Sequence, residues 1–275
     1  GGAAAMIGAV GDDAFGRVNL DRLTRGGVDV SRIAVEAMMP TGSAFVRYRA
    51  DGSRDFVYNI ATSAAARFGW TAAVASLVAR AGHLHVMGSA LSMPNAWGVI
   101  ERAAEVIKAR GGSLSLDPNL RKELRYDDAT EAQFARLVAM SDLLLPSGEE
   151  LERAAGVAGE AAAVARLLDM GVTEVVLKRG ADGATCFRRD GRTEATAFVV
   201  DELDPTGVHE VDPPGAGDCF GGAYLASRRL GLSVAGSLTY GCAAGARNVT
   251  VRGPMEGAGT RAELDDFIRT TKRRV

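Results

Sequence analysis

The sequence predicts a doubly wound α/β fold, in which helices flank a mostly parallel sheet, with a small β-hairpin lid. Short apolar runs such as AMIGAV, HLHVMG and SLSLD alternate with longer helical patterns. These runs are almost continuously hydrophobic, as expected for strands that helices cover on both faces. The alternation of strands and helices favours an open α/β sheet over an all-β or an all-helical protein.

The expected elements follow one another along the chain. Strands are expected at 5–10, 83–88, 113–117, 142–146 and 174–178. Helices are expected at 14–25, near Trp70, and at about 95–110, 130–140 and 149–170.

Two segments break this rhythm and predict hairpins. Residues 43–59 read as two alternating strands joined at Asp51-Gly52, and a second antiparallel pair turns at Asp190-Gly191. We expect 41–66 to form a β lid on an α/β nucleotide- and substrate-binding domain made of 1–40 and 67–275. The alternative is a surface hairpin without a role in binding.

Composition limits the possible partners. The chain has 275 residues with 47% hydrophobic and 24% charged residues, which is the balance of a globular protein, and a net charge of −2. Lys and Arg are scattered, so we expect neither nucleic acid nor a membrane as a partner. The three cysteines lie far apart and no apolar run approaches a membrane span, which favours a cytoplasmic location. His83 and His85 lack the further ligands of a metal site, and we interpret them as core or edge residues.

The segment DPPGAGD, residues 212–218, carries the strongest chemical signal. Gly215 and Gly217 leave backbone amides uncovered where a helix begins, and such a helix start binds anions, especially phosphate. Asp218 beside that site would repel a phosphate, yet it suits phosphoryl transfer, where a base must contact the attacking hydroxyl. The alternative is a glycine-rich turn in which Asp218 only favours the helix start. Neither GxxxxGK[ST] nor GxGxxG spacing occurs, which argues against the two common nucleotide loops.

This segment resembles the C-terminal signature of the ribokinase-like (PfkB) carbohydrate kinases, with Pro213 in place of a Thr. Further segments occur in the family's order: IGAVGDDAFG, DPNLR, LLLPSGEE, VVLKRGADG and VRGPMEG. The chain is most similar to the 2-keto-3-deoxygluconate kinase and fructokinase branch. The resemblance implies an ATP-dependent carbohydrate kinase that phosphorylates a sugar hydroxyl.

The resemblance also implies roles for individual residues. The amides of Gly215, Ala216 and Gly217 would form the anion hole for the transferring phosphoryl group, and Asp218 would accept the hydroxyl proton. Arg121, beside Asn119 in the family's D-x-N-x-R motif, would contact the substrate or the phosphates.

Other matched positions point to the nucleotide and its ions. Glu150 would be the metal residue of the family's N-x-x-E motif, although Ser147 replaces the Asn. We expect ATP with Mg²⁺, and K⁺ as a further candidate ion. The residues expected to bind the nucleotide are Asn119, Lys178, Gly180, Gly183, Gly253 and Gly257.

Two departures from the family concern the substrate. The family begins with a strand carrying a substrate-binding Asp and a GG-x-x-x-N signature, so we expect that the N-terminal strand is missing here. Tyr58 fits the tyrosine that holds a keto acid, but Ile60 and Ala44 stand where the resemblance implies an arginine and an aromatic residue. This weakens the carboxylate clamp and favours a ketohexose over 2-keto-3-deoxygluconate.

Two other functions remain open on the sequence alone. One is a nucleoside kinase, and the other is a non-catalytic sugar-binding regulator on the same fold. A homodimer through the lid is also expected, because exposed hairpin edges tend to be covered by a partner.

Overall fold

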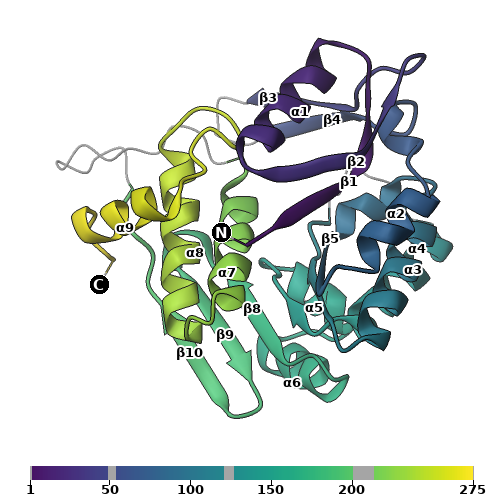
Figure 1. Cartoon of the computed structure of the whole chain (residues 1–275). Helices are drawn as coiled ribbons and strands as arrows, with labels where there is room; N and C mark the ends of the chain where they lie inside the picture. The colour runs from purple at the N-terminus through teal and green to yellow at the C-terminus, as the bar shows by residue number, and fades with distance from the viewer. Residues whose placement is uncertain (1, 49–53, 121–126, 201–213, 275) are drawn as a thin grey trace. The chain divides into compact units, whose positions relative to one another are not determined.

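The computed structural model describes residues 2–48, 54–120, 127–200 and 214–274. They form two compact units, an N-terminal unit, Ala3–Asp142, and a C-terminal unit, Leu143–Val275 with Gly1–Gly2 (Figure 1).

Parallel strands and covering helices make up most of the N-terminal unit. Its elements are β1 (Ala4–Gly11), α1 (Ala14–Arg25), β2 (Val28–Glu36), β3 (Ser43–Tyr48), β4 (Arg54–Asn59), α2 (Ala72–Val78), β5 (His83–Met87), α3 (Ala96–Ala109), β6 (Ser113–Asp117) and α4 (Asp128–Met140), with short 3₁₀ helices η1 (Ala64–Ala66) and η2 (Gly88–Ser92). Strand β1 pairs with β2, and β5 with β6, both in parallel.

Strand β2 was not expected from the sequence. It pairs with β1 over most of its length, directly after α1 and the Gly26-Gly27 turn. Its residues alternate between exposed and partly buried, so it lacks the continuous apolar run by which the other strands were identified. Helix α1, in contrast, spans the residues expected for it.

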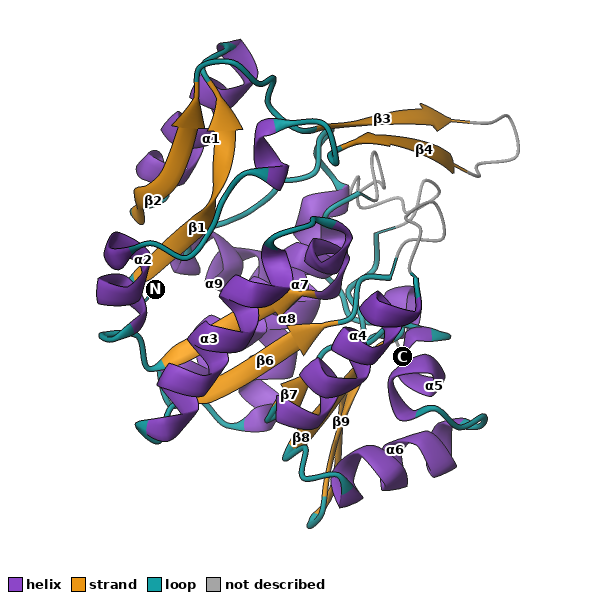
Figure 2. Ribbon diagram, turned by 90° about the vertical axis from the view of Figure 1, so that its right-hand side faces the viewer, coloured by secondary structure: helices purple, strands orange, loops and turns teal. Residues whose placement is uncertain are grey.

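The pair β5–β6 is covered by α3 and α4, which both lie against β6 (Figure 2). His83 contacts the hydroxyls of Ser113 and Ser115 at 2.7 and 2.8 Å, and His85 contacts Ser115 at 2.7 Å. Their ring nitrogens are therefore engaged with hydroxyls of the neighbouring strand, in agreement with their interpretation as structural residues.

The expected hairpin is present as β3 and β4, which pair antiparallel with Phe45 opposite Val57. Its turn at Asp51-Gly52 lies outside the described residues. At its base, Ala64 N donates to Pro40 O at 2.8 Å. The base of the hairpin is therefore closed by a backbone hydrogen bond.

Asp13 ties the start of α1 to this base. Its carboxylate accepts hydrogen bonds from Thr41 N at 2.7 Å, Gly16 N at 2.8 Å and Thr41 Oγ1 at 2.7 Å. The backbone N–H of Thr41 first, then that of Gly16 and the Thr41 hydroxyl, lower the pKa of Asp13 to about 2. Thr41 Oγ1 also accepts from Gly11 N at 2.9 Å, which connects β1 to the same cluster.

The C-terminal unit contains a four-stranded portion of sheet in the order β10-β9-β8-β7. Its elements are β7 (Leu143–Leu144), α5 (Glu150–Ala155), α6 (Glu160–Asp169), β8 (Glu174–Lys178), η3 (Gly180–Asp182), β9 (Ala184–Arg188), β10 (Gly191–Ala195), α7 (Ala216–Arg229), α8 (Val234–Val249) and α9 (Arg261–Thr270). Strands β7 and β8 are parallel, whereas β9 is antiparallel to both β8 and β10, as expected for the turn at Asp190-Gly191.

Helices α7 and α8 pack against each other, and α8 covers β9 and β10 (Figure 1). The core between them includes Val176, Phe220, Tyr224 and Leu238. Val175, Val176 and Leu177 of β8 are all buried, because α6 also contacts this strand. Parallel strands with covering helices in both units confirm the α/β class.

Two expected elements differ in extent. The helix expected over 149–170 is two helices, because Gly156 ends α5 with φ 67° and Gly159 precedes α6 with φ 88°. Left-handed glycines of this kind end helices. The strand expected over 142–146 is reduced to β7, followed by a single bridge between Ser147 and Lys178.

The Asp13 contacts predict a specific acid dependence. A depressed folded-state pKa means that the charged carboxylate stabilises the fold above the ordinary value of 3.8 and that this contribution is lost as pH falls through about 2. We expect Asp13→Asn to lower the melting temperature at pH 7 and to weaken the dependence of that temperature on pH below 4. Thermal unfolding followed by circular dichroism between pH 2 and 7 measures both.

Asp12→Asn is the matched control. It removes only an exposed ion pair with Arg17 at 3.2 Å, and such pairs contribute little. Equal effects of the two substitutions would contradict a specific role for Asp13.

Candidate active site

Helix α7 begins in a tightly held turn. Gly215 has φ 81°, and a Cβ placed on it would lie 1.8 Å from Pro254 O, so only glycine fits. The preceding carbonyl, Pro214 O, accepts a hydrogen bond from Nδ2 of the fully buried Asn248 at 2.9 Å. The chain therefore enters α7 in one fixed direction.

Helix α7 has a glycine at its N-cap, so the N-cap residue offers no side chain to the first amides of the helix. Gly215, at the N-cap, makes no side-chain cap hydrogen bond, and the amide of Cys219 is bonded to Gly215 O at 2.9 Å. The N–H groups of Ala216 and Gly217 precede that first bond, where an α-helix supplies no acceptor of its own. Asp218 is exposed in this first turn. Such a helix start attracts anions.

Lys178 adds a positive charge at the same place. It is the last residue of β8, and its Nζ lies 3.6 Å from the position of a Cβ placed on Gly217. An ammonium group and uncapped amides next to each other are a phosphate-binding arrangement.

Glu150 is the first residue of α5, directly after a turn that neighbours the end of β8. Its Oε2 accepts from Ser147 N at 2.8 Å, and Ser147 bridges Lys178 through the backbone. Within the described part of the chain, no group of three or more His, Cys, Asp or Glu residues could hold a metal ion.

The loop after β8 is shaped by Gly180 and Gly183, with φ 56° and 91°. A Cβ on Gly183 would lie 2.0 Å from Ala195 O, so packing against β10 accounts for this glycine. Arg179 fixes the loop through two hydrogen bonds to Glu160, at 2.7 and 2.9 Å. This pair lowers the pKa of Glu160 and raises that of Arg179.

The loop containing Gly253 and Gly257 packs around the turn before α7. Pro254 lies against Gly215, and a Cβ on Gly257 would lie 2.3 Å from Asn248 Cα. The structure thus brings the expected residues 215–218, Lys178, Gly253 and Gly257 to one end of the C-terminal unit.

Two expected residues lie in the described part of the N-terminal unit. Asn119 follows β6 with φ 39°, a left-handed conformation that is uncommon for residues other than glycine. Tyr58, on β4, stacks on Phe56 with ring centroids 5.9 Å apart. Arg121 lies outside the described residues.

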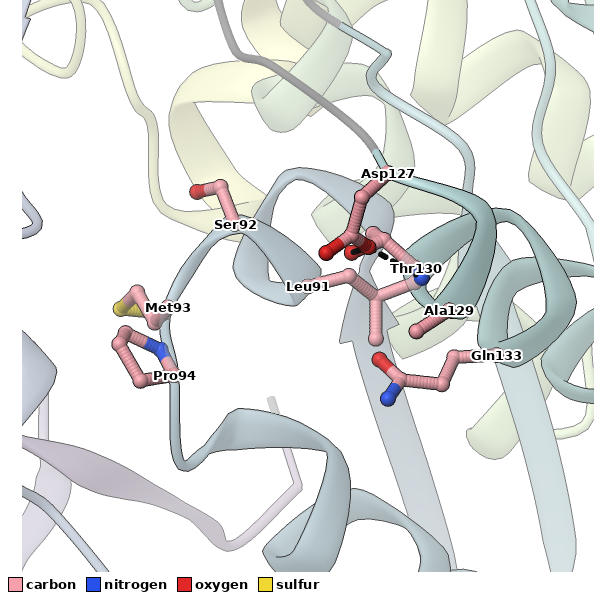
Figure 3. Close-up of a pocket in the computed structure, with 8 residues that line it drawn as sticks. All are labelled: Leu91, Ser92, Met93, Pro94, Asp127, Ala129, Thr130 and Gln133. Atoms are coloured by element: carbon pink, nitrogen blue, oxygen red, sulfur yellow. Dashed lines mark hydrogen bonds between the residues drawn. The ribbon is translucent and has the colours of Figure 1, made fainter.

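The N-terminal unit also has a cavity of about 560 Å³ that the sequence reasoning missed (Figure 3). Its wall is formed by the segments that follow β5 and β6, at the carboxyl ends where α/β sheets bind ligands. The general rule that α/β sheets bind ligands at the carboxyl ends of their strands could have indicated this region. That rule does not identify the side chains that line the cavity. The lining residues are Leu91, Ser92, Met93, Pro94, Asp127, Ala129, Thr130 and Gln133.

The model for the pfkB family of carbohydrate kinases matches residues 1–261. The chain belongs to this family. It is 29% identical over 274 residues to the 2-dehydro-3-deoxygluconokinase of Thermoproteus tenax, covering 98% of this chain and 81% of that protein. It is 30% identical over 278 residues to fructokinase-1 of Zea mays, covering 98% of this chain and 83% of that protein.

The fold of this pfkB kinase is similar to that of a candidate ribokinase II from Escherichia coli, solved with ATP and Mg²⁺. The TM-score is 0.88 at 36% identity, over 98% of this chain and 84% of that one. The resemblance found in the sequence motifs is confirmed, as is the ribokinase-like fold. The protein is an ATP-dependent kinase that phosphorylates a sugar hydroxyl.

Two further observations concern membrane spans and cysteines. Among the described helices, none is both long and apolar enough to cross a bilayer. All three cysteines are free thiols, and burial raises the pKa of both Cys186 and Cys242 to about 11.

The turn before α7 leads to a direct test. We expect Gly215→Ala to displace the helix start, because its Cβ would overlap Pro254 O, and to lower kcat for ATP-dependent phosphorylation at least about tenfold. Steady-state kinetics of the purified variant measure this.

Gly222→Ala on the same helix is the control. No atom lies within 4 Å of a Cβ placed there, so kcat should be unchanged and stability slightly increased. Wild-type kcat in Gly215→Ala would show that the tight turn is not needed for catalysis.

Proposed function

We propose that this pfkB kinase transfers the terminal phosphoryl group of ATP to a hydroxyl of 2-keto-3-deoxygluconate or of a ketohexose. The uncapped start of α7 beside Lys178 is the observation that supports the transfer chemistry most strongly. The amides of Gly215, Ala216 and Gly217 stabilise the charge on the transferring group, and they are fixed in place before the reaction.

Asp218 acts as the general base. It lies in the first turn of α7, beside the amides that would receive the phosphoryl group. A carboxylate placed there removes the proton of the attacking hydroxyl as the bond to phosphorus forms. This role explains a negative charge at a site that is otherwise built for anions.

The nucleotide contacts involve Lys178, the loops at Gly180, Gly183, Gly253 and Gly257, and Asn119. Mg²⁺ would be held mainly by the phosphates of ATP, with Glu150 nearby, because the described carboxylates form no metal cluster of their own.

A monovalent ion such as K⁺ is a further candidate. Within the described residues, Asn248 Oδ1 is buried beside the turn without a hydrogen-bond partner, and an oxygen of this kind suits a hard cation.

On the acceptor side, Tyr58 and Arg121 contact the sugar. The cavity in Figure 3 is lined by Ser92, Thr130 and Gln133, whose polar groups suit the hydroxyls of an open-chain or ring-form sugar. The relatives do not separate a keto acid from a ketohexose, because both kinds match at nearly equal identity. Ile60 in place of the expected arginine favours the neutral sugar.

Two alternatives predict different outcomes. A nucleoside kinase would phosphorylate a riboside in preference to a free sugar, and a non-catalytic regulator would bind sugar without consuming ATP. We propose a cytoplasmic enzyme, in agreement with its free thiols.

The test is an ATP-consumption screen with Mg²⁺ against 2-keto-3-deoxygluconate, fructose, tagatose, ribose and adenosine. We expect the highest kcat/KM with one of the first three acceptors. The highest value with adenosine would favour the nucleoside kinase, and sugar binding without ADP formation would favour the regulator.

The variant Asp218→Asn tests the general base. It should bind ATP as the wild type does, and its kcat should be about 10²–10⁴-fold lower than that of the wild type, the usual contribution of a general base.

We also propose that residues 41–66 act as a lid and that two copies dimerise through it. Phe45 and Val57 are paired across the hairpin, and 64% and 65% of their surfaces are exposed. An apolar cross-strand pair of this kind suits a covered surface. Analytical ultracentrifugation should give a dimer that Phe45→Ser with Val57→Ser dissociates, and a monomeric wild type would contradict the proposal.

A further inference from the structure

A buried acid outside the proposed catalytic group links β8 to α7. Glu174 begins β8 and is 8% exposed. Its carboxylate accepts hydrogen bonds from Arg228 Nη2 at 2.6 Å, from Arg228 Nε at 3.3 Å and from the Tyr224 hydroxyl at 2.8 Å. Arg228 and Tyr224 are four residues apart on α7 and therefore share one face of that helix.

The hydroxyl of Tyr224 is enclosed. The residue is fully buried, its ring stacks on Phe220 with centroids 6.2 Å apart, and its hydroxyl also lies 3.7 Å from Cys186 Sγ. Burial raises the pKa of the Tyr224 phenol and of the Cys186 thiol, so both stay protonated near neutral pH. The hydroxyl is thus held as a donor to Glu174.

Strand and helix are joined at two points. At one end of β8, Lys178 approaches Gly217 of α7. Glu174, four residues earlier on the strand, binds Tyr224, which is seven residues after Gly217 on the helix. The two contacts are separated by about 13 Å along the strand and about 10 Å along the helix. Fixing Tyr224 and Arg228 on Glu174 therefore fixes both the axial position and the rotation of α7 relative to Lys178.

Packing also contributes to this position. A Cβ placed on Gly221 would lie 3.8 Å from Leu145 Cδ1, and on the other side the ring of Phe220 lies against Gly241. These apolar contacts are close but not directional, whereas the hydrogen bonds to one carboxylate are directional and add a constraint on axial position and rotation. An ion pair in which the Arg228 side chain stays 31% exposed adds little net stability, so its contribution lies in its directional geometry.

We propose that Glu174, Tyr224 and Arg228 are positioning residues, which hold the amides of Ala216 and Gly217 and the carboxylate of Asp218 in register with Lys178. This inference rests on the proposed function of the α7 start. It predicts that the loss of one hydroxyl at Tyr224, outside the anion site, slows phosphoryl transfer, because misplacing catalytic groups by a fraction of an ångström is costly.

The test compares Tyr224→Phe with Tyr240→Phe. Both remove one phenol hydroxyl that pairs with a carboxylate, but Tyr240 is on α8 and pairs with Asp265 of α9. At a temperature where all variants are folded, we expect Tyr224→Phe to lower kcat about tenfold with the KM for ATP changed less than about twofold. Tyr240→Phe should match the wild type.

A double-mutant cycle adds Glu174→Gln and the double variant of Glu174→Gln with Tyr224→Phe, and kcat is measured for each. If the residues act as a unit, the double variant should lose little more kcat than Glu174→Gln alone. Unchanged kcat in Tyr224→Phe, or a fall equal to that in Tyr240→Phe, would overturn the inference even if the melting temperature decreases.

Hydrogen exchange separates this inference from the proposed function. Peptides covering the first two turns of α7 should exchange several-fold faster in Tyr224→Phe than in the wild type or Tyr240→Phe, with or without a sugar acceptor. A wild-type enzyme that phosphorylates none of the acceptors would remove the proposed function, and the exchange rates would still decide whether Tyr224 holds α7. Equal exchange in all three proteins would overturn the positioning role.

Discussion

The open start of α7 is the constraint on which the candidate site depends. A helix end normally finds caps or water for its first amides, and here the N-cap is a glycine, held in its turn by Pro254, which has no side chain to cover them. The amide of Asn248 holds the carbonyl before the turn from the other side. Binding a phosphate then requires little rearrangement, which is the condition for strong electrostatic stabilisation in a transition state.

Two kinds of ion pair in the C-terminal unit serve different purposes. Arg179 and Glu160 are partly exposed and fix a loop, where the pair is screened by water and contributes little to stability. In the second pair the acid is enclosed, because the Glu174 side chain is only 11% exposed while Arg228 is 31% exposed, and Tyr224 satisfies the same carboxylate. A charge in such surroundings is tolerated only with good geometry, so this cluster selects one arrangement of strand and helix.

The fold class, the family and the glycine turn before α7 could be predicted because each depends on local signals, such as apolar runs, turn residues and a glycine-rich motif. Strand β2 was missed because its residues are half exposed. The break between α5 and α6 was missed because glycine also occurs inside helices, so Gly156 and Gly159 did not by themselves indicate a helix end. The Glu174 cluster could not be predicted, since its partners are 50 and 54 residues away and a strand-initial glutamate is usually a surface residue. The cavity lining depends on side-chain packing after two separate strands.

The closed base of the β3–β4 hairpin limits how this segment can move. Because Ala64 N binds Pro40 O while Asp13 holds Thr41, both ends of the excursion are attached to the same part of the N-terminal unit. If the hairpin moves as the proposed lid, it moves about this anchored base. A motion of that kind would leave the contacts of Asp13 and Thr41 with β1 and α1 in place, so it need not disturb the packed core.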